Sequence, residues 1–124
     1  MTEQDTATMQ TFREVINQVV AANSDHTDAA DLDLGDAVRV ERDGFEDLSI
    51  ERIRENKVSV MHTYKQRGDL MRDPEIVFDT GGDEWIPVEF RQDPMHHEHN
   101  QNGVDCGEFL QTWARNLDNQ GFTQ

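Results

Sequence analysis

Apolar residues recur every three or four positions near the amino terminus of the chain. They are Met9, Phe12, Val15, Ile16, Val19 and Val20. This spacing places them on one face of a helix, so we predict an amphipathic helix over residues 7–22. Residues 24–36, which follow, are polar, acidic and rich in helix-breaking residues, and this composition predicts a loop or linker.

The period of the apolar positions changes to two after Ala37. Val38 and Val40 alternate with charged residues, and similar alternation recurs in several later runs. Such runs are typical of strands that bury one face, and the short connections between them favour an antiparallel meander of about five strands over residues 37–91. Because Pro87 lacks an N–H group, its strand should lie at a sheet edge or contain a bulge.

The last apolar period in the chain is helical again. Residues 92–103 are polar and are predicted to form a loop. Beyond them, one helical face collects Val104, Phe109, Leu110, Trp113 and Leu117. This pattern predicts a helix over residues 104–119. A sheet with one apolar face can bury that face under two helices that each carry an apolar stripe. The pattern therefore predicts an α+β fold of two layers, as a single domain over residues 1–124.

The composition is strongly acidic, with 26 acidic residues against 11 basic ones and a net charge of -15. Only Lys57 and Lys65 are lysines, and the carboxylates are spread along the whole chain. Such a surface suits concentrated salt, where screening limits the repulsion between like charges to about 3 Å at 1 M. We therefore expect a halophilic protein. The alternative is an acidic DNA mimic, whose charges would gather on one element.

The composition also indicates the cellular compartment of the protein and the kinds of partner it can bind. No apolar run approaches the roughly 20 residues of a membrane span, and the first residues lack the pattern of a signal peptide. The single cysteine, Cys106, excludes an intramolecular disulfide and suits a reducing compartment. We expect a cytoplasmic protein with no membrane contact. Without a basic stripe, direct electrostatic binding to nucleic acid is not expected. A protein partner of unknown identity stays open.

The stretch GDLMRDPE joins two alternating runs and combines carboxylates with large apolar side chains. In a structural interpretation, Gly68 adopts a positive φ, and the carboxylates of Asp69 and Asp73 accept backbone N–H bonds in the bend. Leu70 and Met71 would then pack under the end of the sheet. This interpretation explains each residue type without any catalytic chemistry.

The same stretch also supports a catalytic alternative. With the histidine of the preceding run, its carboxylates form a candidate catalytic cluster of His62, Asp69, Asp73 and Glu75. A divalent metal held by such a cluster would activate water for phosphodiester hydrolysis. No nucleophile–base pair and no glycine-rich phosphate loop accompanies these residues in the sequence, so an enzyme is the less favoured hypothesis.

A second candidate metal site lies in the polar stretch after the last predicted strand. Its ligands would be His96, His97, His99 and Cys106. Imidazoles two and three residues apart can converge on one zinc ion, and the cysteine is close enough in sequence to join them. The spacing matches no zinc finger and no H-E-x-x-H helix, so the alternative is a solvated loop without a cofactor.

Several of these motifs resemble those of a family of small uncharacterised domains from haloarchaea and from bacterial plasmids and conjugative elements. The residues that carry the resemblance are His62, Tyr64, Gly68, Asp69, Leu70, Met71, Asp73, Pro74, Glu75, Trp85, Pro87, Arg91, Gln92, Asp93 and the closing WARNLDNQGF that begins at Trp113. The resemblance covers roughly residues 35–122 and implies a shared fold and genomic setting, but no reaction. The chain departs from the family pattern at its histidine cluster. We therefore predict a non-catalytic accessory or interaction protein of a halophilic archaeon or of one of its mobile elements.

Overall fold

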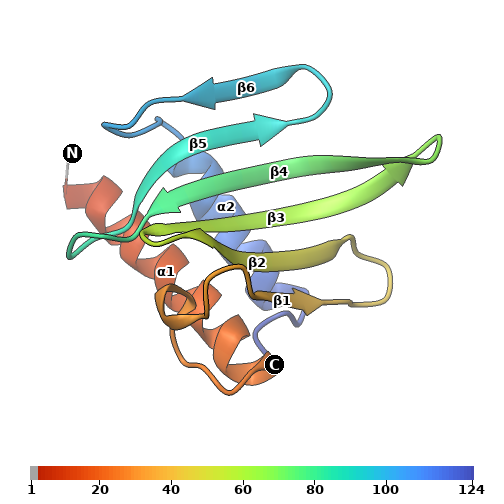
Figure 1. Cartoon of the computed structure of the whole chain (residues 1–124), viewed down its shortest axis with the longest axis horizontal. Helices are drawn as coiled ribbons and strands as arrows, with labels where there is room; N and C mark the ends of the chain where they lie inside the picture. Colours follow the sequence, from red (N-terminus) through yellow and green to blue (C-terminus); the bar gives the residue numbers. More distant parts are fainter. Residues whose placement is uncertain (1–2) are drawn as a thin grey trace.

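The computed structural model describes residues 3–124 and the side chains of residues 8–124. In this part of the chain, two helices cover one face of a six-stranded antiparallel sheet (Figure 1). The helices are α1 (Glu3–Asn23) and α2 (Gly107–Asn119), and they pack against each other as well as against the sheet. The predicted α+β fold of two layers is confirmed, with one strand more than the approximate five expected.

The strands follow their chain order across the sheet. They are β1 (Ala37–Val40), β2 (Asp47–Arg54), β3 (Lys57–Gln66), β4 (Asp69–Asp79), β5 (Ile86–Gln92) and β6 (His96–His99). Each strand is antiparallel to its neighbour, so the sheet is a meander. Strand β6 lies inside the stretch predicted to be a loop. Its side chains are all exposed, so no apolar alternation marked it, and its place follows from backbone pairing with β5.

The acidic linker at residues 24–36 is ordered against the rest of the molecule. It contains a short 3-10 helix, Ala29–Asp31, whose first turn is capped by a hydrogen bond of 2.9 Å from Ala30 N to Asp28 Oδ1. A second bond of 2.9 Å, from Ala29 N to Asn17 Oδ1, ties it to α1. Ala29 and Leu32 are buried in the core, so two apolar residues anchor an otherwise polar segment.

The hydrophobic core lies between the sheet and the two helices. The sheet contributes Val38, Val40, Leu48, Ile50, Val58, Val60, Ile76 and Phe78, which alternate along their strands as the period of two predicts. Phe12 of α1 joins the layers, because its ring lies 5.4 Å from that of Phe78 and 5.3 Å from that of Trp113 in α2. Burying a large apolar side chain contributes about 1.5–3 kcal/mol, so this face supplies most of the stabilisation.

Two bulges let prolines lie in interior strands. The register of β3 and β4 passes from the pair Met61–Glu75 to the pair Thr63–Arg72, so Asp73 and Pro74 together oppose His62. The register of β4 and β5 shifts in the same way beside Pro87, which pairs with Phe78. The bulge predicted from the missing N–H of Pro87 is therefore present, in a strand that is not at the edge.

Strands β3 and β4 extend beyond the rest of the sheet as a hairpin, residues 64–71, which we call the arm (Figure 1). Its turn consists of Arg67 (φ 53°) and Gly68 (φ 86°), between the paired Gln66 and Asp69. Positive φ at both central residues is the geometry of a type I′ hairpin turn. The positive φ expected of Gly68 is confirmed. The burial expected of Leu70 is wrong: its side chain is 62% exposed, because the arm extends past the helices.

Candidate functional site

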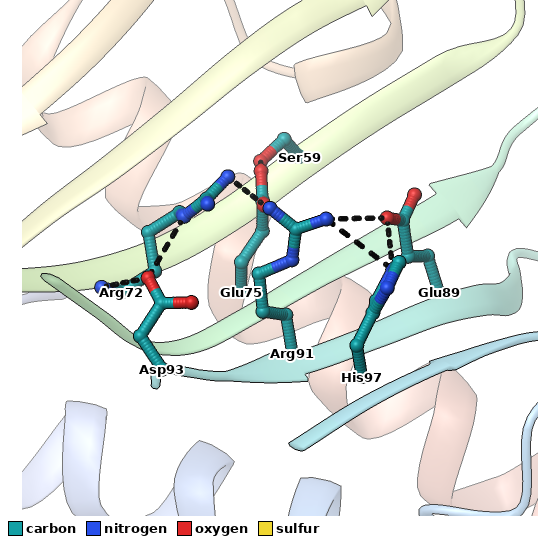
Figure 2. A network of polar contacts seen from close by, with 7 residues as sticks. All are labelled: Ser59, Arg72, Glu75, Glu89, Arg91, Asp93 and His97. Carbon is teal, nitrogen blue, oxygen red and sulfur yellow. Dashed lines mark hydrogen bonds and ion pairs between the residues drawn. The ribbon is translucent and has the colours of Figure 1, made fainter. Parts of the chain in front are cut away.

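The face of the sheet turned away from the helices, which we call the open face, carries a network of polar contacts (Figure 2). Glu75 lies at its centre. Ser59 Oγ donates a hydrogen bond of 2.6 Å to Glu75 Oε2, and Arg72 Nη1 lies 3.4 Å from Glu75 Oε1. Both carboxylate oxygens of this candidate catalytic residue are therefore engaged by its neighbours.

Asp93 closes one end of this network. Its Oδ2 accepts hydrogen bonds from the backbone N–H of Arg72 at 2.9 Å and from Arg72 Nε at 3.1 Å. The backbone bond is the main reason why the pKa of Asp93 lies below its ordinary value. Asp93 was not among the predicted site residues. Its signals in the sequence are its place before Pro94 at a strand end, where aspartate commonly accepts backbone N–H bonds, and its part in the motifs that carry the family resemblance.

The other end of the network joins β5 to β6. His97 Nε2 donates a hydrogen bond of 2.7 Å to Glu89 Oε1, and Arg91 Nη2 lies 3.6 Å from the same oxygen. Ser59 and Val77 lie on this side of the sheet and are nevertheless buried. The charged side chains therefore pair with one another and cover this side of the sheet. Each carboxylate in the network has a hydrogen-bond or ion-pair partner, so none is free to act as a base.

His62 lies on the opposite side of the sheet, among aromatic side chains. Its ring centroid is 5.5 Å from that of Trp113 and 5.6 Å from that of Phe122. Nδ1 lies 3.2 Å from the carbonyl oxygen of Glu46 and 3.3 Å from that of Asp47, so this nitrogen carries the proton. Burial lowers the pKa of His62, which favours the neutral imidazole.

The structure does not bring the predicted catalytic residues together. His62 and Glu75 lie on opposite faces of the sheet. Asp69 is exposed at the tip of the arm, with no side-chain partner among the described residues, and Asp73 accepts a hydrogen bond of 3.1 Å from Gln92 Nε2. Neither aspartate accepts the backbone N–H bond expected of it; that prediction is wrong, and Asp93 has this role instead. The geometry gives the hydrolase hypothesis no support.

The remaining residues of the predicted structural motif have places in the arm and in the core. Tyr64 pairs with Met71 across the arm, and both are half-buried. Trp85 and Trp113 are buried in the core, where Trp85 packs on Phe78 at 5.5 Å between ring centroids. These residues therefore support the fold and do not line a shared catalytic pocket.

The strand geometry of β6 also separates the candidate zinc ligands. His97 points to the open face, where it contacts Glu89, whereas the ring of His96 lies 5.4 Å from that of Phe90. His99 pairs with Glu89 in the register of the sheet. Within the part of the chain that the structure describes, no group of three or more His, Cys, Asp or Glu side chains is arranged to hold a metal ion. Alternation along a strand, which the loop prediction did not include, places His96 and His97 on different faces of the sheet.

Cys106, the fourth candidate ligand, lies directly before α2. Burial, together with the nearby carboxylates of Asp105 and Glu98, raises the pKa of its thiol to about 12. The thiolate is the form that binds metals and attacks electrophiles, so a thiol held protonated is suited to neither task.

Cys106 lines a hollow where the start of α2 meets α1, β5 and β6, which we call the Cys106 hollow. It consists of two adjoining cavities of about 440 and 730 Å³ that share Thr8, Asp105, Cys106 and Gly107. The apolar lining of the first cavity comes from Met9, Ile86, Pro87, Val104 and Leu110. The second is lined by the acidic groups Glu98, Asp105 and Glu108 together with His96, which shares this cavity with Cys106, and by the rings of Phe90 and Phe109. Among the described residues that line the hollow, none is Lys or Arg.

The loop before α2 shapes this hollow. Val104 N donates a hydrogen bond of 2.7 Å to Pro87 O, which holds the loop against the start of β5. The helix predicted from residue 104 begins at Gly107, and Val104 lies in the loop before it. Gly103 (φ 122°) lies close to Ile86: a Cβ at this glycine would lie 3.6 Å from Ile86 Cγ2.

Comparisons with known proteins place the chain in a family. The family model of a domain of unknown function (DUF6908) matches residues 10–123. The chain belongs to this family. The match takes in the whole sheet, α2 and most of α1, so the open face and nearly all of the Cys106 hollow lie within the family domain. No curated protein and no solved structure matches the chain. Neither helix in the described residues has the length and apolar character to cross a membrane.

Proposed function

We propose that the protein is a non-catalytic interaction domain, an accessory protein of a halophilic archaeon or of one of its mobile elements, that binds a protein partner at the Cys106 hollow. The observation that carries this proposal is the combination of an apolar floor and an acidic rim in one concave site. Concave sites with a mostly apolar lining and a few polar groups are the usual place for ligands.

The chemistry of the Cys106 hollow favours binding over catalysis. Its cysteine is protonated, and a protonated thiol is a poor nucleophile. The acidic rim formed by Glu98, Asp105 and Glu108 would attract a positively charged partner, and the floor would accept an apolar side chain. The expected partner is therefore a protein segment that combines basic and apolar side chains.

The halophilic setting is supported by the hydrogen bonds of two arginines, Arg42 and Arg52. Arg42 Nε and Nη2 donate to the backbone oxygens of Gly121 at 3.1 Å and Gln124 at 2.8 Å, and Arg52 Nη1 donates to that of Leu32 at 3.0 Å. These bonds connect distant segments at hydrogen-bond distance. Screening by salt weakens long-range attraction far more than such short hydrogen bonds.

The salt requirement can be measured by thermal unfolding. With a net charge of -15, unscreened carboxylates repel one another, so the melting temperature should rise between low and molar KCl. A melting temperature that does not change with salt would remove the halophilic part of the proposal.

The binding proposal can be tested with a photo-crosslinking amino acid placed in the native host. Asn102 lines the hollow, whereas its neighbour Gln101 is also exposed and does not. We expect a discrete crosslinked product from position 102 that is absent from position 101 and is lost when Asp105→Lys reverses a charge at the rim. Equal products at both positions, or a product that Asp105→Lys does not affect, would contradict the proposal.

A further inference from the structure

The arm presents basic and apolar side chains next to each other. Lys65 and Leu70 are direct cross-strand partners, so their side chains lie on the same face of the arm. Arg67 adds a second positive charge in the turn, Asp69 beside it carries the arm's one negative charge, and these residues are all exposed. This combination stands out in a chain whose net charge is -15, and an exposed leucine at the end of a hairpin has no role in the core.

The Cys106 hollow has the complementary character. Its floor is apolar, its rim carries Glu98, Asp105 and Glu108, and none of its described lining residues is Lys or Arg. A leucine side chain entering the hollow would leave water for an apolar surface, and basic groups beside it would meet carboxylates. The chain therefore carries both a protruding segment and a hollow of matching chemistry.

The two surfaces are too far apart to meet within one copy. Leu70 is nine residues from Asp79 along β4, which corresponds to roughly 30 Å at the rise of a strand. Asp79 pairs with Ile86, which lines the hollow. The arm and the start of α2 accordingly lie at opposite ends of the molecule (Figure 1). A contact between them requires a second copy of the chain.

We propose that the arm of one copy docks in the Cys106 hollow of a second copy. Leu70 enters the apolar floor, and Lys65 and Arg67 face the acidic rim. The contact joins two different surfaces, so it is heterologous and builds a ring or an open chain of copies. This proposal rests on the Cys106 hollow being the binding site of the proposed function, and it names the occupant.

The first test measures self-association of the full chain by sedimentation equilibrium, at high micromolar concentration in about 1 M KCl, where the general repulsion is screened. Leu70→Ser should weaken association about tenfold or more, since it removes the buried apolar side chain. Leu34→Ser is the matched control, because Leu34 is 63% exposed and lies neither in the arm nor in the hollow. A monomeric wild-type chain, or equal effects of the two variants, would overturn the proposal.

The second test exchanges the charges across the contact. Lys65→Glu and Asp105→Lys should each weaken association, because each places like charges at the contact. Mixing the two variants should restore it, since each arm then meets a hollow of opposite charge. Arg39→Glu, a charge reversal on an exposed residue of β1, is the control: by itself it should associate like the wild type, because it changes neither the arm nor the hollow. Failure of the mixture to associate would contradict docking of the arm in the hollow.

The crosslinking experiment separates this inference from the proposed function. If position 102 captures another protein while the purified chain stays monomeric, the hollow binds a partner and the inference about a second copy is wrong. If position 102 captures nothing and the chain is monomeric, both are wrong.

Discussion

The two faces of the sheet are stabilised in different ways. The face under the helices buries Phe12 against Phe78 and Trp113, among apolar side chains from strands β1 to β5. The open face is covered by its own charged side chains, which pair around Glu75 and Glu89 (Figure 2). Apolar burial is non-directional and insensitive to a particular partner, whereas each pair on the open face depends on one geometry. Substitutions should therefore have large effects on the covered face and graded, partner-specific effects on the open one.

The largest effect is expected from Phe12→Ala. This change removes a fully buried ring at the junction of both helices and the sheet, and such deletions cost about 3–5 kcal/mol. Phe45→Ala is the matched control, because the Phe45 side chain is 46% exposed, and it should cost under about 1 kcal/mol. Chemical denaturation of both variants measures the difference, and similar losses would contradict the assignment of the core.

The next largest effect is expected from Asp93→Ala on the open face. It leaves the backbone N–H of Arg72 without its carboxylate acceptor and should lower the free energy of unfolding by about 1–2 kcal/mol. Asp69→Ala should have almost no effect, since Asp69 is exposed and has no side-chain partner in the described part of the chain. If Asp69→Ala were the more damaging change, the arm would have a structural role that its geometry does not show.

Acid should weaken the fold through the same aspartate. The folded-state pKa of Asp93 lies below the ordinary value of 3.8, so its stabilisation is fully present above that value and is lost as the pH falls through the folded pKa. Asp93→Asn has no such proton to bind. We expect the stability difference between wild type and Asp93→Asn to shrink as the pH falls below about 4. Urea unfolding at a series of acidic pH values measures this difference, and a constant difference would contradict the assigned pKa direction.

His62 should produce a separate pH dependence from the covered face. Its folded-state pKa lies below the ordinary 6.5, so the unfolded chain binds the proton more readily. Stability should therefore fall as the pH drops from 6.5 towards the folded pKa, and His62→Phe should show a weaker fall. Titration of the imidazole by NMR checks the direction directly, and a pKa above 6.5 would contradict it.

The smallest effect is expected from Glu89→Gln. Its partners His97 and Arg91 are partly exposed, and pairs of this kind contribute about 0–1 kcal/mol. The loss should be measurable at low salt and should vanish in about 1 M KCl, where the charge is screened. Denaturation at both salt concentrations tests this. A loss that persists in molar salt would show that the open face depends on hydrogen bonds more than on charge.

Much of the fold could be predicted from local patterns. The apolar spacing from Met9 to Val20 is visible in the sequence and corresponds to the buried side of α1, and Val58 and Val60 point to the core as their alternation requires. Gly68 in a left-handed conformation and the bulge beside Pro87 follow from single residues with restricted or unusual backbone freedom. The free energy of burying an apolar side chain and the steric limits of the backbone depend on single residues and their near neighbours. The helix, the strands, the turn and the bulge therefore leave a signal in the sequence.

The sites depend on contacts between distant segments and left no such signal. Strand β6 carries no apolar alternation and exists because its backbone pairs with β5. Its alternation then places His96 and His97 on different faces of the sheet, so these two predicted zinc ligands do not point to the same place. The register of β3 and β4 likewise puts His62 and Glu75 on opposite faces. The sequence by itself determined which residues seek the core, but only the tertiary structure decided which polar groups meet, because a one-residue shift in register moves a side chain to the other face.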